Sequence, residues 1–188
     1  MAYLVPLAVL VGLSLLLLGL GTVLYNALVR LQNACDDSWS EIDTELRRRH
    51  DLIPHLVEIV EGHARHERDV LERVTRSRNT AAANNGSPAL RAHDENILAG
   101  GLRQVFALVE DYPDLKASRK FTDLQEELSA TEDRLERARR SYNMSVRDLN
   151  NRAEAFPSNI VAGIFALPRR EYFESDVPAA LKSTAINF

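Results

Sequence analysis

The chain has 188 residues, enough for one domain of ordinary size plus an appendage. Hydrophobic residues make up 45% of it and charged residues 27%, which allows a core beneath a charged, helix-like surface. The net charge of -4 argues against a nucleic-acid-binding protein, because such proteins usually carry a basic excess.

The first predicted element is a membrane-spanning helix at the N-terminus. Residues 2–29 carry no charged side chain, and Leu4 through Leu24 is nearly all Leu, Val, Ala and Gly. At about 1.5 Å per residue, this stretch covers the roughly 30 Å hydrocarbon core of a bilayer. A cleaved signal peptide is disfavoured because a basic n-region is missing and the apolar run is too long for an h-region. We therefore predict an uncleaved transmembrane signal anchor over residues 1–24.

The distribution of basic residues predicts the orientation of this anchor. No Lys or Arg precedes the span, whereas Arg30 and then Arg47, Arg48 and Arg49 follow it. Basic residues stay on the cytoplasmic side of membrane helices. We therefore expect a short N-terminus outside and a cytoplasmic C-terminal domain.

Two helical segments flank Pro54. Proline removes one backbone N–H and clashes with the preceding turn, so a continuous helix must kink or end there. Apolar residues recur at three- and four-residue steps on both sides of it. They are Leu28, Leu31, Cys35, Ile42 and Leu46 before the proline, and Leu56, Val57, Val60, Ala64 and Val74 after it. The segment from Leu46 to Val57 is interpreted as a joint that leads into the next helix.

Two further helices are predicted downstream. The first runs from about Ala89 to Glu110, between turn signals at residues 84–88 and 111–114. The second keeps the heptad step of a coiled coil until Phe156-Pro157 ends it. Its apolar stripe comprises Phe121, Leu124, Leu128, Leu135, Ala138, Tyr142, Val146 and Leu149.

These segments predict an all-α fold, with the transmembrane helix followed by an antiparallel bundle of long helices. The bundle has three or four helices, depending on whether Pro54 kinks or breaks the first. The predicted divisions are the anchor at 1–24, the bundle at 25–156, and an apolar segment with a C-terminal tail at 157–188. The apolar residues of the last division either pack on the bundle or contact another subunit or the membrane surface. These residues are Ile160, Val161, Ile164, Phe165 and Leu167.

The titratable side chains indicate no catalytic, cofactor or metal site. His63 and His66 are placed on one helix face with Glu67 beside them, but the second histidine of a zincin motif is missing. The paired Glu-x-x-His motifs of di-iron bundles are also missing. The histidines are therefore interpreted as surface residues. Cys35 lies on an apolar stripe without an adjacent basic residue, which predicts a buried, inert thiol.

Polar residues on or beside the apolar stripes predict an interhelical network. Buried charges are costly unless they are paired, so acidic residues of the first two segments should meet arginines of the last helix. Asp51 and Arg139 are one expected pair. The other members are Asp43, Thr131, Glu132, Arg134, Tyr142 and Asn143. We expect such a network to fix the register of the helices, and ion pairs of Arg47–Arg49 within the bundle are preferred over binding to lipid headgroups.

A series of short motifs, in this order, resembles the LemA family from about Tyr25 to Phe173. The motifs are Tyr25-Asn26-x-Leu28-Val29, Trp39-Ser40-x-Ile42-Asp43, Arg48-Arg49-His50-Asp51-Leu52-Ile53-Pro54, Tyr112-Pro113-x-Leu115-Lys116-Ala117, Thr131-Glu132-x-Arg134, Tyr142-Asn143 and Phe156-Pro157-Ser158-Asn159. The resemblance implies one N-terminal membrane span and a cytoplasmic helical bundle. It implies no enzymatic activity, and relatives linked to membrane remodelling or organelles suggest scaffolding.

We therefore predict a non-enzymatic, single-pass protein of the bacterial inner membrane whose bundle self-assembles as a scaffold. The alternative is a monomeric, membrane-tethered adaptor or sensor that recruits a protein partner. The expected partners are the lipid bilayer, further copies of the chain and other membrane proteins, but not nucleic acid.

Overall fold

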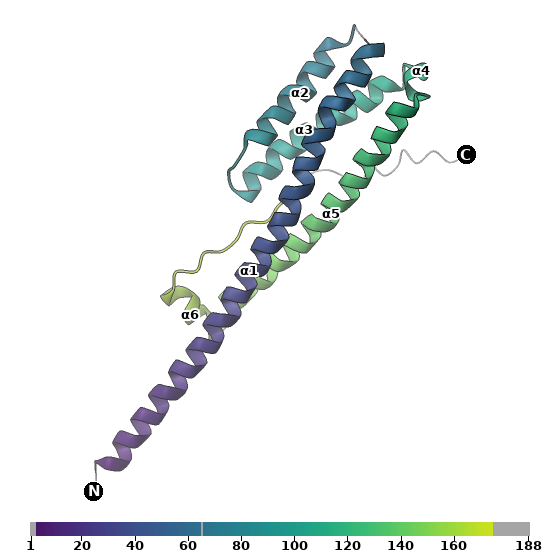
Figure 1. The fold of residues 1–188 in the computed structure, drawn as a ribbon. Helices are drawn as coiled ribbons and strands as arrows, with labels where there is room; N and C mark the ends of the chain where they lie inside the picture. The colour runs from purple at the N-terminus through teal and green to yellow at the C-terminus, as the bar shows by residue number, and fades with distance from the viewer. Residues whose placement is uncertain (1–2, 65, 175–188) are drawn as a thin grey trace. The chain divides into compact units, whose positions relative to one another are not determined.

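The structure, a computed structural model, describes residues 3–64 and 66–174, and every regular element within these ranges is a helix (Figure 1). The predicted all-α class is therefore confirmed. The elements are α1 (Leu4–His63), α2 (Arg68–Ala83), α3 (Pro88–Val109), α4 (Pro113–Lys116), α5 (Arg119–Glu154) and α6 (Ser158–Ile164). Residues 175–188 of the predicted tail lie outside the described residues.

Helix α1 passes through Pro54 and ends only at His63. The break considered at Pro54 does not occur, and the segment Leu46–Val57 is not a joint between two helices. Proline cannot donate to the carbonyl four residues earlier, which belongs to His50. Arg78 of α2 takes over this role, donating from Nε to the His50 carbonyl at 2.9 Å. The Pro54 side chain itself is exposed, so its ring does not disturb the core.

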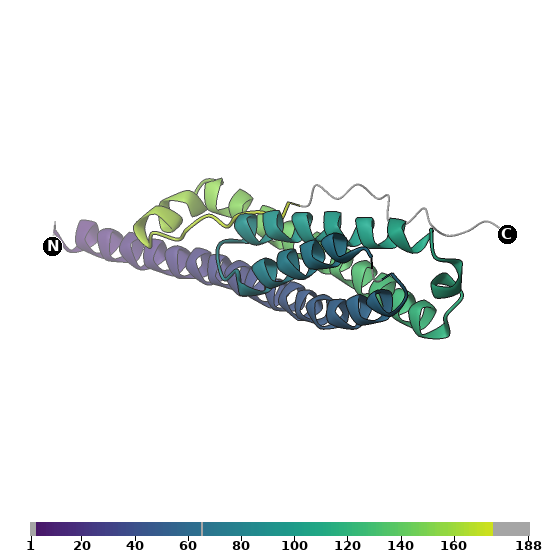
Figure 2. The same cartoon turned by 90° about the horizontal axis from the view of Figure 1, so that it is seen from above.

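The chain divides into two compact units, which we describe separately. Among the described residues, the central unit comprises residues 39–142, with residue 65 left out, and residues 171–174. Its helices share one apolar core, to which α1, α2, α3, α4 and α5 all contribute. Helices α2 and α3 lie side by side in both views (Figures 1 and 2). The core includes Ile53, Leu56, Val60, Val74, Leu98, Val105, Leu115 and Phe121.

The terminal unit comprises residues up to Ser38 and residues 143–170. The large apolar side chains of α1 from Leu4 to Val23 are exposed, and burial begins at Leu24. Beyond that point α1 packs against the end of α5 and against α6, with the rings of Tyr25 and Phe165 4.5 Å apart. Among the described residues, α1 is the one helix long and apolar enough to cross a membrane, judged by length and composition.

Candidate functional site: a buried charge cluster

A buried charge cluster lies in the central unit between α1, α3 and α5. Its centre is Arg49 of α1, whose side chain is fully buried, together with His50 and with Glu95 of α3, which is 1% exposed. Arg49 occupies a heptad position of α1 that is elsewhere apolar and equally buried. The other residues at this position are Leu28, Cys35, Ile42 and Leu56.

Two carboxylates neutralise the Arg49 guanidinium. Its Nη2 pairs with one oxygen of Glu95, and its Nη1 donates to Glu132 of α5 at 2.9 Å. The other Glu95 oxygen lies 2.8 Å from Nε2 of His50. Glu95 is thus shared between two consecutive residues of α1, and Arg49 joins three helices. Pairing with both carboxylates offsets the hydration that the guanidinium loses on burial, while its Nε is buried without a hydrogen-bond partner among the described residues.

The electrostatic surroundings keep His50 neutral at neutral pH. Burial, together with the nearby guanidinium groups of Arg49, Arg78 and Arg91, lowers the pKa of His50 to about 4. A neutral imidazole can still donate its Nε2–H to Glu95. Burial and the charge of Arg49 likewise lower the pKa of Arg139 to about 10, which leaves this guanidinium charged at neutral pH.

An aromatic layer covers one side of the cluster. Phe173 is 1% exposed, and its ring lies 5.7 Å from the Trp39 ring and 5.2 Å from the Arg139 guanidinium. The hydroxyl of Tyr142 donates to the Glu171 carbonyl at 2.9 Å. These contacts fix residues 171–174, here called the C-terminal strap, against α1 and α5. The Phe173 ring of the strap thereby covers the Arg139 guanidinium.

Two further ion pairs join the helices around the cluster. Arg91 of α3 donates to Asp43 at 2.7 Å, and Arg134 of α5 donates to Glu45 at 2.9 Å. Although burial raises the pKa of Asp43, hydrogen bonds from Arg91 and Arg47 outweigh it and hold that pKa below its usual value. Carboxylates of α1 therefore hold both neighbouring helices.

The predicted network of ion pairs between helices is present, but some of its members differ from those predicted. Glu45 and Arg134 join the first and last long helices as expected, whereas the specific pair of Asp51 and Arg139 is wrong. Asp51 is 79% exposed and lies 3.9 Å from Arg78. The sequence predicts ion pairs of Arg49 within the bundle, but Glu95, its buried partner on α3, is absent from the predicted network. The available signal was a charged residue standing at an otherwise apolar stripe position.

The residues considered for metal or thiol chemistry lie elsewhere. His63 ends α1 and His66 lies in the connection to α2, so the expectation that they share a helix face is wrong. After His63 the backbone N–H of Glu67 donates to the Ala64 carbonyl at 3.1 Å, so His66 lies outside the helix. Cys35 is fully buried, as predicted, and burial raises the pKa of its thiol.

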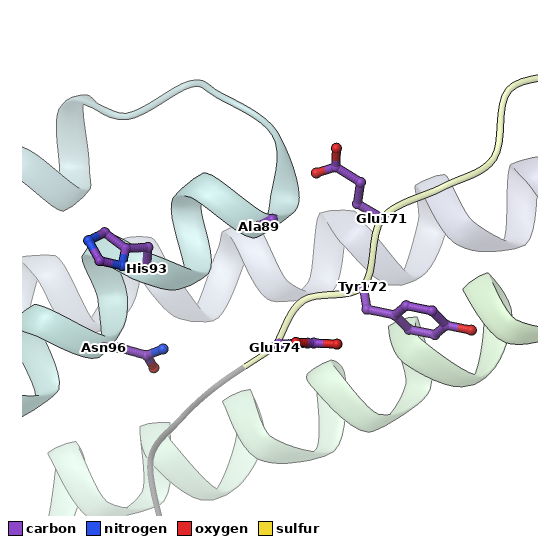
Figure 3. A pocket seen from close by; sticks show the side chains of 6 residues that line it. All are labelled: Ala89, His93, Asn96, Glu171, Tyr172 and Glu174. Carbon is purple, nitrogen blue, oxygen red and sulfur yellow. The ribbon is translucent and has the colours of Figure 1, made fainter.

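One pocket of about 440 Å³ lies between α3 and the C-terminal strap (Figure 3). It is lined by His93 and Asn96 of α3 and by Glu171, Tyr172 and Glu174. Within the described ranges, no group of three or more His, Cys, Asp or Glu side chains is placed to hold a metal ion. The charge cluster itself is enclosed by helices and the strap. Its arrangement suits it to locking helices together.

Comparisons with known proteins place these features in a family context. The model of the LemA family matches residues 38–188. Protein LemA of Metamycoplasma hominis is 29% identical over 140 residues, covering 73% of this chain and 63% of that protein. Magnetosome protein MamQ 2 of Paramagnetospirillum magneticum is 24% identical over 175 residues, covering 80% and 64% respectively. MamQ of Magnetospirillum gryphiswaldense is 24% identical over 174 residues, covering 79% and 64%. The matched region is thus just under two thirds of each relative's length.

Proposed function

This chain belongs to the LemA family, and from that premise we propose that it is a non-enzymatic membrane scaffold. In this proposal the N-terminal part of α1 anchors each copy in the bacterial inner membrane, with the N-terminus outside. The helices beyond it form a cytoplasmic antiparallel bundle. Copies held in one orientation then assemble through repeated lateral contacts.

The exposed apolar start of α1 is the observation that carries the proposal. Its large apolar side chains from Leu4 to Val23 are 47–68% exposed. A continuous apolar surface of this size is not stable in water, whereas a helix of about 30 Å matches the hydrocarbon thickness of a bilayer. The first basic residue, Arg30, follows the exposed stretch, and this supports the proposed orientation.

A lateral contact is best supported on α3. Leu90 and Ile97 are 60% and 53% exposed, and they stand seven residues apart on one helix face. Helix α5 offers less exposed apolar surface for a lateral contact, because its heptad stripe from Phe121 to Leu149 is buried within the chain. The heptad stripe of α5 is therefore used within the chain and does not offer a surface for another copy.

Native mass spectrometry of the full-length protein in lipid nanodiscs tests this function. We expect masses of several protomers for the native chain and a shift toward one protomer for Ile97→Glu. Gln104→Glu is the matched control, because it adds the same charge one heptad further along the same face, at an exposed polar position. A single protomer mass for the native chain would overturn the scaffold.

A groove between α1 and α2 favours the second candidate function, a monomeric adaptor. It has a volume of about 820 Å³, and its lining combines apolar residues such as Val57 and Leu71 with charged residues such as Glu61 and Arg76. Mixed linings of this type suit an amphipathic segment of a partner protein. Under this function, a photo-crosslinker at Thr75 would capture one defined partner while the chain keeps a single protomer mass.

A further inference from the structure

We propose that α6 and its flanking residues form a second membrane contact, which rests in the lipid interface beside the N-terminal anchor. We call this surface the interfacial foot and define it as Phe156, Ile160, Ile164 and Phe165. The inference deepens the proposed function and rests on its membrane anchoring. It assigns the foot a partner of stated chemistry, the boundary between lipid headgroups and acyl chains.

The foot is the outward face of a short amphipathic segment. Ser158, Val161 and Ala162 of α6 are buried against the rest of the terminal unit. The four residues of the foot are 81%, 53%, 73% and 55% exposed, in chain order. Beyond α1 and the foot, the large apolar side chains exposed in the described residues are Leu90 and Ile97 on α3, Met144 on α5 and Tyr172. The foot gathers four such side chains within ten positions of the chain, as expected for a surface that meets an apolar partner.

The position of the foot along α1 indicates which partner this is. The exposed stretch of α1 ends at Val23, and Leu24 is the first buried residue of the helix. At about 1.5 Å per residue, the stretch from Leu4 to Val23 already spans about 30 Å, the thickness of the hydrocarbon core. The ring of Phe165 lies 4.5 Å from the ring of Tyr25, the next residue of α1. The foot therefore lies where α1 leaves the lipid, and Figure 2 shows α6 beside this part of α1.

The charge pattern fits the same location. Residues 155–168 contain no charged side chain, which makes them the longest uncharged stretch after the N-terminal one. Charge returns at Arg169 and Arg170, which pair with Glu154 and Asp36 within the same unit. Aromatic rings at the interface and an uncharged apolar face are typical of segments that lie in the membrane surface. Through the contact of Phe165 with Tyr25, the foot adjoins the exposed apolar stretch of α1 that ends at Val23, which favours lipid over a second copy of the chain.

Fluorescence quenching by lipid tests the foot in the full-length protein. In a Cys35→Ala background, single cysteines replace Ile164, Leu13 and Met144, and each is labelled with the environment-sensitive dye NBD. The proteins are reconstituted in phosphatidylcholine–phosphatidylglycerol vesicles, with and without doxyl-labelled lipid. Met144 is the matched control, because it is apolar, 56% exposed and in the same unit. The neighbouring Ser145 bonds Ser38, which lies about 20 Å along α1 from Tyr25 at about 1.5 Å per residue.

We expect doxyl lipid to quench the labels at positions 164 and 13 several-fold more strongly than the label at position 144. Quenching at 13 but not at 164 overturns the foot and leaves the anchor intact. If neither label is quenched, the proposed anchoring of α1 is wrong, and the proposed membrane contact of the foot is overturned as well. Quenching at 164 that disappears as the protein-to-lipid ratio rises shows that a second copy covers this face, which also overturns the proposal. The emission of Trp39 verifies that each variant folds like the native chain.

Discussion

The bond between Arg78 and the backbone of α1 gives the sharpest test of how this fold tolerates Pro54. Replacing Arg78 with Met removes the donor that lies 2.9 Å from the His50 carbonyl while keeping an apolar stem. His50 is 6% exposed, so water cannot easily replace that donor. An unsatisfied buried acceptor costs about 1–3 kcal/mol of stability. The other contacts of Arg78, at 3.9 Å from the exposed Asp51 and at 3.2 Å from the Asn79 side chain, lie near the surface, and the ion pair with Asp51 adds less than about 1 kcal/mol.

A double-mutant cycle with Pro54→Ala isolates this bond. Alanine at position 54 supplies the missing N–H to the His50 carbonyl, and because Pro54 is exposed the change leaves no cavity in the core. We expect Arg78→Met to lower the free energy of unfolding by about 1–3 kcal/mol in the native background and by well under 1 kcal/mol in the Pro54→Ala background. Urea unfolding of the detergent-solubilised full-length chain, followed by helical circular dichroism, measures both values.

A matched control comes from Arg134, which also bridges two helices but bonds a side chain, Glu45. Its replacement by Met should cost the same in both backgrounds. If Arg78→Met is equally costly with proline and with alanine at position 54, the guanidinium does not stand in for the missing backbone donor. The explanation for the unbroken α1 would then be wrong.

Three further predictions concern the charge cluster. Because the pKa of His50 is lowered to about 4 from an unfolded value of about 6.5, the unfolded chain binds more protons between these values, and stability should fall as the pH drops from 7 to 5. The loss should be on the order of 1 kcal/mol in urea unfolding, and His50→Gln should abolish this part of the pH dependence. Phe173→Ala should release the strap and shift the fluorescence emission of Trp39, the chain's sole tryptophan, to longer wavelength. The same change should lower the free energy of unfolding by about 3–5 kcal/mol. Arg49→Leu and Glu95→Leu should each cost about 3–5 kcal/mol, and the double variant should recover most of this stability; strictly additive losses would refute the pairing.

Apolar periodicity was sufficient to predict the helices but not the ion pairs that join them. The helix predicted from Ala89 to Glu110 is observed as Pro88–Val109, because a three- and four-residue apolar step reports directly which face is buried. Apolar periodicity does not identify Glu95 as buried, because a carboxylate within such a stripe is usually assigned to the surface. Its burial depends on Arg49, a partner 46 positions earlier. A pairing at that distance leaves no local pattern.

The path of α1 through Pro54 was undecided from the sequence for a similar reason. Proline is compatible with a kink or an end, and the choice depends on whether the carbonyl of His50 finds another donor. That donor, Arg78, follows 28 residues later on α2. The end of α1 at His63 is likewise not marked by a proline or glycine at that position of the sequence. Local propensity alone could not distinguish these outcomes.

The buried charges also fix the register between helices α1 and α5, which the apolar stripes alone do not determine. Helices α1 and α5 both carry buried residues at seven-residue intervals, so a slip of one heptad, about 10 Å at 1.5 Å per residue, would still place apolar groups against apolar groups. Such a slip would carry Arg49 of α1 away from Glu132 of α5 and leave the buried guanidinium without one of its two carboxylates, at a cost of several kcal/mol. The hydrophobic stripes thus provide most of the stability, while the ions select one register. These heptad positions are Leu28, Cys35, Ile42, Arg49 and Leu56 in α1 and Phe121, Leu128, Leu135, Tyr142 and Leu149 in α5.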